Sequence, residues 1–286
     1  MNTTKLFMAA MTVLAITACS NDEEQMLTSN EGEIQLDLIH PASQTRVTDT
    51  QFEYDDKVGV YVTAADSKLQ IGGNEVNNEK FVYNGTSWTS PRTVYWNKGN
   101  HNVYAYYPYS EVVSDIEDYK FSVQTDQSTN EGYAKSDFLW ANVSNIAATS
   151  SAVKMKFAHK LSCVNVVLEK GDSYEGEIPS STEVYLYSTV PTALISLASG
   201  DAAKDSYSSV ETIRCNQISP IEYRAIVVPQ SLNSRRPIVE VIIGNVSYLM
   251  EGKISYKPGM RHTLTVTLES NPEKIKINIG GEITVW

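Results

Sequence analysis

Side chains that could perform acid–base or nucleophilic chemistry are few in this chain, and their spacing matches no catalytic motif. A zinc protease needs His-Glu-x-x-His, one class of hydrolase needs Gly-x-Ser-x-Gly, and many redox proteins use Cys-x-x-Cys. None of these motifs occurs, nor does a glycine-rich phosphate loop. The four histidines are widely scattered: His40, His101, His159 and His262. We therefore predict no enzyme activity, no cofactor and no metal site.

Carboxylates and tyrosines are the remaining candidates for a binding site. The acidic clusters are Asp55-Asp56 and the set Asp115, Glu117 and Asp118. Such carboxylates could bind calcium or hydrolyse glycosides, but they are far more often solvated loop charges. Four tyrosines crowd around Pro108: Tyr104, Tyr106, Tyr107 and Tyr109. They could stack on sugar rings or, more simply, fill the two faces of a sheet.

The first residues have the pattern of a secretion signal that ends at a modifiable cysteine. Lys5 precedes an apolar stretch over residues 6–18, which has the length of a signal-peptide core and not the roughly 20 residues of a membrane-spanning helix. Ile16-Thr17-Ala18-Cys19 resembles the lipobox of bacterial lipoproteins, so residues 1–18 should be removed and Cys19 acylated with palmitate. The acidic residues 20–24 resemble the export tag of Bacteroidota surface lipoproteins, which implies a surface-exposed anchor in the cell outer membrane.

Length, charge and cysteine content limit the remaining function classes. Loss of residues 1–18 leaves 268 residues (286 minus 18), enough for one large or two ordinary domains. The formal charge of −11 falls by one with Lys5, and an acidic chain repels phosphate backbones, so we predict no nucleic-acid partner. Apart from Cys19, only Cys163 and Cys215 remain. They could form a disulfide after export, although isolated cysteines in strands are more often small buried residues.

The periodicity of the chain predicts strands almost throughout. Residues 33–38 alternate polar and apolar side chains, as a half-buried strand does. Asn84-Gly85 and Gly244-Asn245 are typical hairpin turns, because these residues tolerate positive φ. We expect an all-β fold with two β-sandwich domains in tandem. The polar stretch 141–151 predicts a boundary near residue 150, which gives domains over 47–150 and 151–286 after an acidic tether and first strand over 19–46.

Several segments follow one another in a characteristic order over nearly the whole chain. They are the lipobox at Cys19, Thr45-Arg46 before Phe52, Val58-Gly59-Val60-Tyr61, Trp96 ahead of residues 103–108, Ser136-Asp137-Phe138-Leu139-Trp140-Ala141, Phe157-Ala158-His159-Lys160-Leu161-Ser162, residues 223–229 and Pro258-Gly259-Met260-Arg261-His262. Together these segments resemble the fimbrillin family of Bacteroidota, the subunits of type V pili, and the Phe-x-His-Lys-Leu and Pro-Gly segments are the most specific.

The resemblance implies a fold and a mode of assembly. The domains would be transthyretin-like β-sandwiches. A trypsin-like surface protease would cut after an arginine in the first loop, the first strand would leave, and a strand of a neighbouring pilus subunit would replace it. The partners would be other pilus subunits, the protease, and the outer membrane through the lipid anchor, with the subunit in the fimbrium after processing. A glycan or protein receptor, and a stalk, tip or anchor role, stay open.

The residues around the first predicted strand fit this scheme on physical grounds. Ile34, Leu36 and Leu38 share one face, and their burial would stabilise the docked strand by roughly 5–9 kcal/mol, at about 1.5–3 kcal/mol each. A sandwich that lacks a strand exposes unpaired backbone groups, which another strand can satisfy. Arg46 lies just after this strand in a polar loop, so we predict cleavage between Arg46 and Val47. The alternative is that Arg46 is a plain surface arginine.

Residues near the end of the sequence are the candidate donor strand. Their apolar side chains alternate on either side of Gly280-Gly281: Ile275, Ile277 and Ile279, then Ile283 and Val285. If all five entered a neighbour's groove, they would bury more apolar surface than the departing three. The alternative is that residues 275–279 form the last strand of their own domain.

A rival function is a monomeric glycan-binding surface lipoprotein. In that case aromatic side chains such as Trp88 and Trp96 would form a platform for sugar rings.

Overall fold

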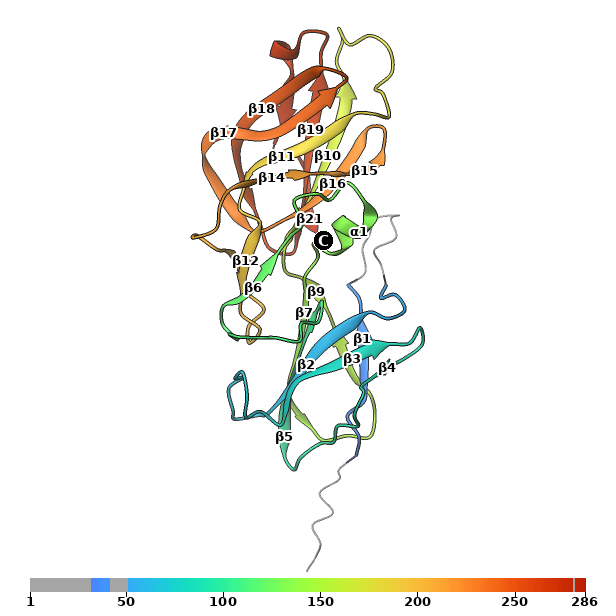
Figure 1. Cartoon of the computed structure of the whole chain (residues 1–286), viewed down its shortest axis with the longest axis vertical. Helices are drawn as coiled ribbons and strands as arrows, with labels where there is room; N and C mark the ends of the chain where they lie inside the picture. The colour runs from blue at the N-terminus through green and yellow to red at the C-terminus, as the bar shows by residue number, and fades with distance from the viewer. Residues whose placement is uncertain (1–31, 42–50, 280) are drawn as a thin grey trace, which may run out of the picture.

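The structure is a computed structural model that describes residues 32–41, 51–279 and 281–286 (Figure 1). Strands dominate the described chain, and its helical elements are α1 (Asn130–Ala134) and the short 3-10 helix η1 (Pro272–Lys274). The predicted all-β class is therefore confirmed. No helix within the described residues is both long enough and apolar enough to span a membrane.

The first half of the chain forms an antiparallel sheet with the strand order β4-β3-β2-β5-β7-β9. Its strands are β2 (Lys57–Ala64), β3 (Val76–Tyr83), β4 (Trp88–Thr89), β5 (Asn100–Tyr107), β7 (Leu139–Ala147) and β9 (Ala158–His159). A separate pair of parallel strands, β1 (Leu36–Ile39) and β8 (Val153–Lys156), completes this half. Apolar side chains of the sheet and of the pair form a first core, which includes Val60, Phe81 and Met155.

The second half contains a mixed sheet and a smaller antiparallel one. The mixed sheet has the order β15-β16-β10-β19-β20, and β21 also pairs with β19. Its strands are β10 (Ser162–Lys170), β15 (Asn216–Ser219), β16 (Glu222–Val227), β19 (Met260–Leu268), β20 (Lys276–Asn278) and β21 (Ile283–Val285). The second sheet, β14-β11-β17-β18, consists of β11 (Glu183–Thr189), β14 (Glu211–Arg214), β17 (Gln230–Ile243) and β18 (Val246–Tyr256). Both sheets contribute to the second core.

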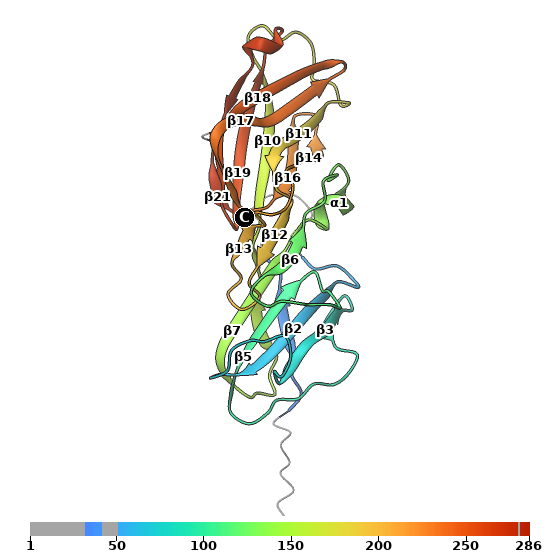
Figure 2. The ribbon, with the colours of Figure 1, turned by 60° about the vertical axis from the view of Figure 1, so that its left-hand side comes forward.

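A three-stranded sheet joins the two halves, which lie end to end along the long axis (Figure 2). Its order is β13-β12-β6, and its strands are β6 (Tyr119–Ser122), β12 (Thr192–Ile195) and β13 (Ala202–Lys204). Strand β6 comes from the first half of the chain, and Tyr133 of α1 also belongs to the second core. Conversely, β8 and β9 come after residue 150 in the sequence but pair with β1 and β7 of the first half. Segments from both sides of residue 150 thus pack in the opposite half. The domain boundary near residue 150 stays a prediction.

Strand β2 of the first sheet is buried on both faces, which explains its continuous apolar run. Val58, Val60 and Val62 contribute to the first core, whereas Tyr61 contributes to the second. A strand covered on both sides needs apolar side chains at consecutive positions.

The predicted turns follow from glycine at positive φ. Gly244 has a φ of 61° between β17 and β18, which leaves a two-residue turn as expected. Asn84 and Gly85 also lie in a turn, but this turn covers residues 84–87. The Asn84 side chain explains the difference, because its Oδ1 accepts hydrogen bonds from the Thr86 and Ser87 N–H groups.

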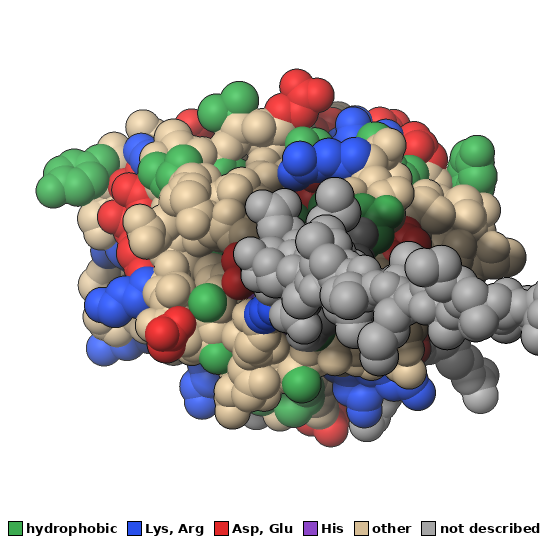
Figure 3. Space-filling model, turned by 90° about the horizontal axis from the view of Figure 1, so that it is seen from below, with side chains coloured by type: hydrophobic (Ala, Val, Ile, Leu, Met, Phe, Trp, Pro, Cys, Tyr) green, Lys and Arg blue, Asp and Glu red, His purple; other side chains and the backbone are tan. Residues whose placement is uncertain are grey.

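The lower end of the molecule carries mixed charges on its described surface (Figure 3). Acidic and basic side chains are interspersed there, with single hydrophobic side chains between them. Single exposed hydrophobic side chains are normal on soluble proteins.

Candidate functional site

Strand β1 is held along one side by a single strand. It runs parallel to β8 with Leu36 opposite Val153 and Ile39 opposite Lys156. The N–H of Val153 donates to the Gln35 carbonyl at 2.8 Å, and the N–H of Phe157 donates to the Ile39 carbonyl at 3.0 Å. In sheet terms, β1 is therefore an edge strand.

A short bridge just before β1 fastens its beginning. The N–H of Ile34 donates to the Val94 carbonyl at 2.9 Å, and the N–H of Trp96 donates to the Gly32 carbonyl at 3.1 Å. This bridge uses a different segment from β8, so residues 32–39 contact two separate segments, one after the other.

The apolar face of this segment is part of the first core. Ile34, Leu36 and Leu38 are 3%, 6% and 6% exposed, and all three belong to that cluster. Asp37, between the two leucines, is exposed. The predicted alternation is thus present, and the apolar side chains are the main contribution of this segment to stability.

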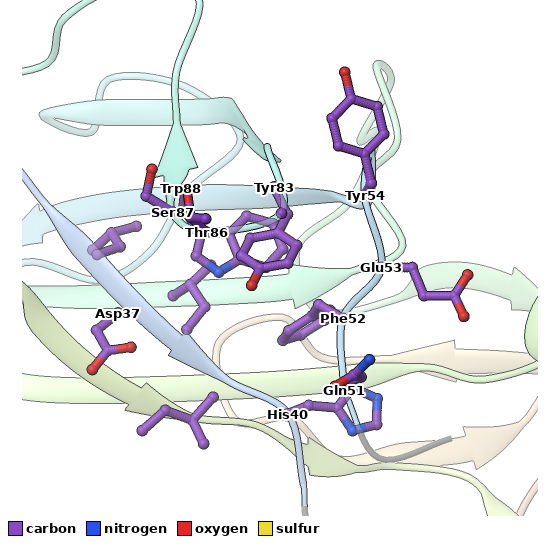
Figure 4. Close-up of a pocket in the computed structure, with 14 residues that line it drawn as sticks. Asp37, His40, Gln51, Phe52, Glu53, Tyr54, Tyr83, Thr86, Ser87 and Trp88 are labelled. Carbon is purple, nitrogen blue, oxygen red and sulfur yellow. The ribbon is translucent and has the colours of Figure 1, made fainter. Parts of the chain in front are cut away.

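An open cavity of about 700 Å³ lies along β1. Its other wall is formed by residues 51–54 and the β3–β4 turn. Figure 4 shows Phe52 and Tyr83 projecting into this space, whereas Tyr54 points away from it. Phe52 contacts Phe157 and Trp88 in edge-to-face geometry, at 5.5 Å and 4.9 Å between ring centroids. The cavity leaves the segment accessible to solvent beside its buried face.

The predicted processing residues lie outside the described part of the chain. They are Cys19, Arg46 and Val47. Lipidation of Cys19 and cleavage after Arg46 stay predictions. In the sequence, Arg46 falls between the end of β1 and Gln51, the first described residue after it.

The candidate donor segment lies at the edge of its own sheet. Strand β20 pairs with β19 through Ile277 and Val266, and β21 pairs with β19 through Ile283 and His262. The side chains of Ile275, Ile277 and Ile279 are half-buried against the second core. By contrast, Ile283 is 44% exposed and Val285 is 78% exposed. The arrangement corresponds to a last strand docked on its own domain, with two of the five apolar side chains left unburied.

Two glycines allow the tail to lie this close. A Cβ on Gly281 would lie 2.1 Å from the Thr263 carbonyl oxygen, so only glycine fits against β19 at this point. A Cβ on Gly252 would lie 2.2 Å from Cδ1 of Ile279, so Gly252 makes the space that the Ile279 side chain fills.

His262, on the strand that holds the tail, makes the stability of the folded protein depend on pH. Its Nε2 accepts a hydrogen bond from the Lys257 N–H at 2.9 Å, and burial lowers the pKa of the imidazole. The unfolded chain therefore binds a proton first, near pH 6.5. The contribution of neutral His262 to the free energy of unfolding should be complete above that pH and decrease as the pH falls towards the lowered pKa of the folded state. We expect urea midpoints measured between pH 7 and pH 5 to fall less in His262→Gln than in the native protein; equal slopes would contradict this.

A family model described as fimbrillin-like matches residues 45–286. This chain belongs to the fimbrillin-like family.

Two curated relatives of this fimbrillin-like protein are named as fimbrial subunits. "Putative fimbrium tip subunit Fim1C" of Bacteroides ovatus is 27% identical over 173 residues, which cover 52% of this chain and 32% of that protein. The match thus spans about a third of that relative's length. "Putative fimbrium subunit Fim1C" of Bacteroides uniformis is 21% identical over 298 aligned residues, which cover 98% of this chain and 94% of that protein.

Solved structures share the fold of the fimbrillin-like chain. A crystal structure described as "a putative cell adhesion protein" from Bacteroides ovatus has a TM-score of 0.71 at 18% identity, covering 89% of this chain and 96% of that one. A second one, from Bacteroides uniformis, has a TM-score of 0.68 at 20% identity, covering 89% and 99%. At such identity the likeness establishes the fold alone.

The aromatic platform predicted for glycan binding is not present as expected in this fimbrillin-like protein. Trp96 is 1% exposed, and its Nε1–H donates to the Thr149 carbonyl at 2.9 Å. The exposed Trp96 of this rival prediction is therefore wrong, because the side chain packs among the apolar side chains of the first core. Trp88 is half-buried and packs against Phe52 and Tyr83.

The other residues considered for chemistry have structural partners in the fimbrillin-like fold. Tyr106 is buried and donates to Asn78 Oδ1 at 2.8 Å. His101 contacts Glu75 through Nδ1 at 2.7 Å. Cys163 and Cys215 are free, buried thiols, and burial raises the pKa of both. Among the described residues, no group of three or more histidine, cysteine or acidic side chains could hold a metal ion.

Sequence reasoning missed one buried residue near the tail. Trp286 is 7% exposed, although Val285 beside it is largely exposed. The strand period alone could have indicated that Trp286 faces opposite to Val285, but not what it contacts.

Proposed function

We propose that this protein is a fimbrial subunit, exported as a lipoprotein through Cys19, that polymerises by donor-strand exchange. Cleavage after Arg46 releases residues 32–41, and a strand from a neighbouring subunit takes their place. The observation that carries the proposal is the position of β1 at a sheet edge, where its Leu36 and Leu38, together with Ile34 just before it, are part of the first core.

Loss of this segment would leave a groove with a defined set of backbone partners. The N–H groups of Val153, Phe157 and Trp96 would lose their acceptors, and the Val94 carbonyl would lose its donor. Buried backbone groups without partners are unfavourable, and so is an open apolar trough. A second strand with alternating apolar side chains relieves both, which is the physical basis of strand addition.

The tail supplies a donor with such alternation. Ile283 and Val285 contribute little to their own domain because they are exposed. In a neighbour's groove they would be buried, together with the half-buried Ile275, Ile277 and Ile279. Five buried side chains would then replace the departing Ile34, Leu36 and Leu38, so exchange is favoured by apolar burial.

Limited trypsin digestion of the purified protein lacking residues 1–19 tests the proposal. We expect a ladder of multimers on a denaturing gel of unboiled samples, with a new N-terminus at Val47. The Arg46→Ala variant should give no ladder, because the first segment then stays attached. Arg235→Ala is the matched control: its side chain is 76% exposed, so its loss should leave the ladder unchanged. A ladder in Arg46→Ala, or a cleaved protein that stays monomeric, would overturn the proposal.

A further inference from the structure

Trp286 anchors the end of β21 where the two halves of the molecule meet. Its ring stacks on the ring of His159, with 3.8 Å between centroids and 10° between planes. The backbone N–H of Trp286 donates to the Gly259 carbonyl at 3.0 Å. His159 lies on β9, the edge strand of the first sheet, whereas β21 belongs to the second half. Figure 1 shows residue 286 at the junction, near α1. This ring contact thus fastens the tail to a strand of the first half.

His159 provides a fixed surface for this contact. Its Nδ1 lies 3.0 Å from Asp137 Oδ1, which orients the ring, and the residue is 3% exposed. Its Nε2 is buried and has no hydrogen-bond partner among the described residues. A buried polar atom without a partner is unfavourable, so the docked state carries a penalty at Nε2, on the edge of the His159 ring, that the stacking contact must offset. The docked arrangement therefore depends on the stacked ring.

The end of the removable segment lies beside the same contact. His40 directly follows β1, and its ring lies 5.9 Å from that of His159 and 5.0 Å from that of Phe52, edge to face in both cases. A cavity of about 490 Å³ is lined by His40, Phe52, Tyr107, Asp137 and Trp286, among others. When residues 32–41 leave, His40 leaves this cavity, and water can reach the edge of the Trp286–His159 stack.

We infer that Trp286 is a latch that keeps β21 docked on its own subunit until the first segment departs. This inference rests on the proposed function, because it explains when the donor becomes available. Without the Trp286 ring, main-chain contacts hold β21: the pairs Met260–Val285, Arg261–Thr284 and His262–Ile283, and the two hydrogen bonds that flank them, from the Thr263 N–H to the Glu282 carbonyl and from the N–H of residue 286 to the Gly259 carbonyl. The side chains of Ile283 and Val285 add little to them. Departure of His40 weakens the Trp286–His159 contact. Loss of the first segment (residues 32–41) and release of the donor segment are therefore coupled.

Hydrogen exchange of the uncleaved protein tests the latch without any polymer. In Trp286→Ala, amides of residues 281–286 should exchange about tenfold faster or more, because the stacked ring pair is lost. Trp286→Phe should show a smaller rise, since a ring can still stack. Val285→Ala is the neighbouring control and should match the native protein, as should β10 amides in every variant. Native-like exchange of the tail in Trp286→Ala would overturn the latch.

The coupling to β1 is tested by His40→Ala, also without cleavage. Tail exchange should rise towards the level of Trp286→Ala, and the double variant should show no further rise. Gln51→Ala, which changes another lining residue of the same cavity, is the control and should leave tail exchange unchanged. Native-like tail exchange in His40→Ala would overturn the coupling. If tail exchange rises as expected but trypsin produces no ladder, the latch is supported and the proposal of donor-strand exchange is wrong.

Discussion

Replacement of both Leu36 and Leu38 by alanine should allow multimers to form without any protease. Each leucine is 6% exposed in the first core, and removal of such a side chain costs roughly 2–5 kcal/mol. The sum is comparable to the roughly 5–9 kcal/mol that burial of Ile34, Leu36 and Leu38 gives this segment. The backbone adds little resistance, because in the described part of the chain β1 pairs with β8 alone, and residues 32–34 bridge to residues 94–96. The first segment should therefore undock while still attached.

Size-exclusion chromatography and unboiled gels of the untreated double variant measure this effect. Asp37→Ala is the matched control, since Asp37 lies between the two leucines on the exposed side of the same strand; it should stay monomeric. Thermal unfolding should show a lower midpoint in the double variant, with the second core still folded. A double variant that is monomeric and folded would show that the first segment does not block strand exchange in the way proposed.

A Gly252→Val substitution should release the tail from its own domain. The new Cβ would lie 2.2 Å from Cδ1 of Ile279 and 3.1 Å from Cδ1 of Ile238. Overpacking of this kind costs typically 1–3 kcal/mol, and Ile279 is the partner that can move, because it lies in the edge segment. We expect faster hydrogen exchange of residues 275–279 and, after trypsin, faster ladder formation than in the native protein.

Ile279→Ala supplies the compensating change. With the isoleucine truncated, a valine at position 252 has space, so the double variant should be more stable than the sum of the two single effects predicts. The coupling free energy is measured from urea unfolding of the four proteins. Additive effects would mean that the substitution at Gly252 acts through Ile238 in the core and not through the tail. Slower ladder formation in Gly252→Val would argue against this tail as the donor.

The residue pattern alone is sufficient to predict the class of fold and the buried face of the first strand. A period of two residues places Ile34, Leu36 and Leu38 on one side, whichever strand lies next to them. Local chemistry was equally sufficient at Gly244-Asn245, because the turn needs only residues that accept positive φ. The strand boundaries shifted: regular pairing begins at Leu36, and the expected first residues form a bridge to Tyr95.

Which segments pair with one another follows from the three-dimensional packing and not from the local pattern. Periodicity gives the face of a strand but not its partner, so nothing in residues 33–38 indicated β8 or the position of β1 at a sheet edge. The same limit applies to Trp96 and Trp286, whose burial depends on neighbours far away in sequence. The exchange of β6, β8 and β9 between the halves has the same cause: apolar faces pair where burial is greatest, and the polar stretch at 141–151 does not prevent them from crossing it.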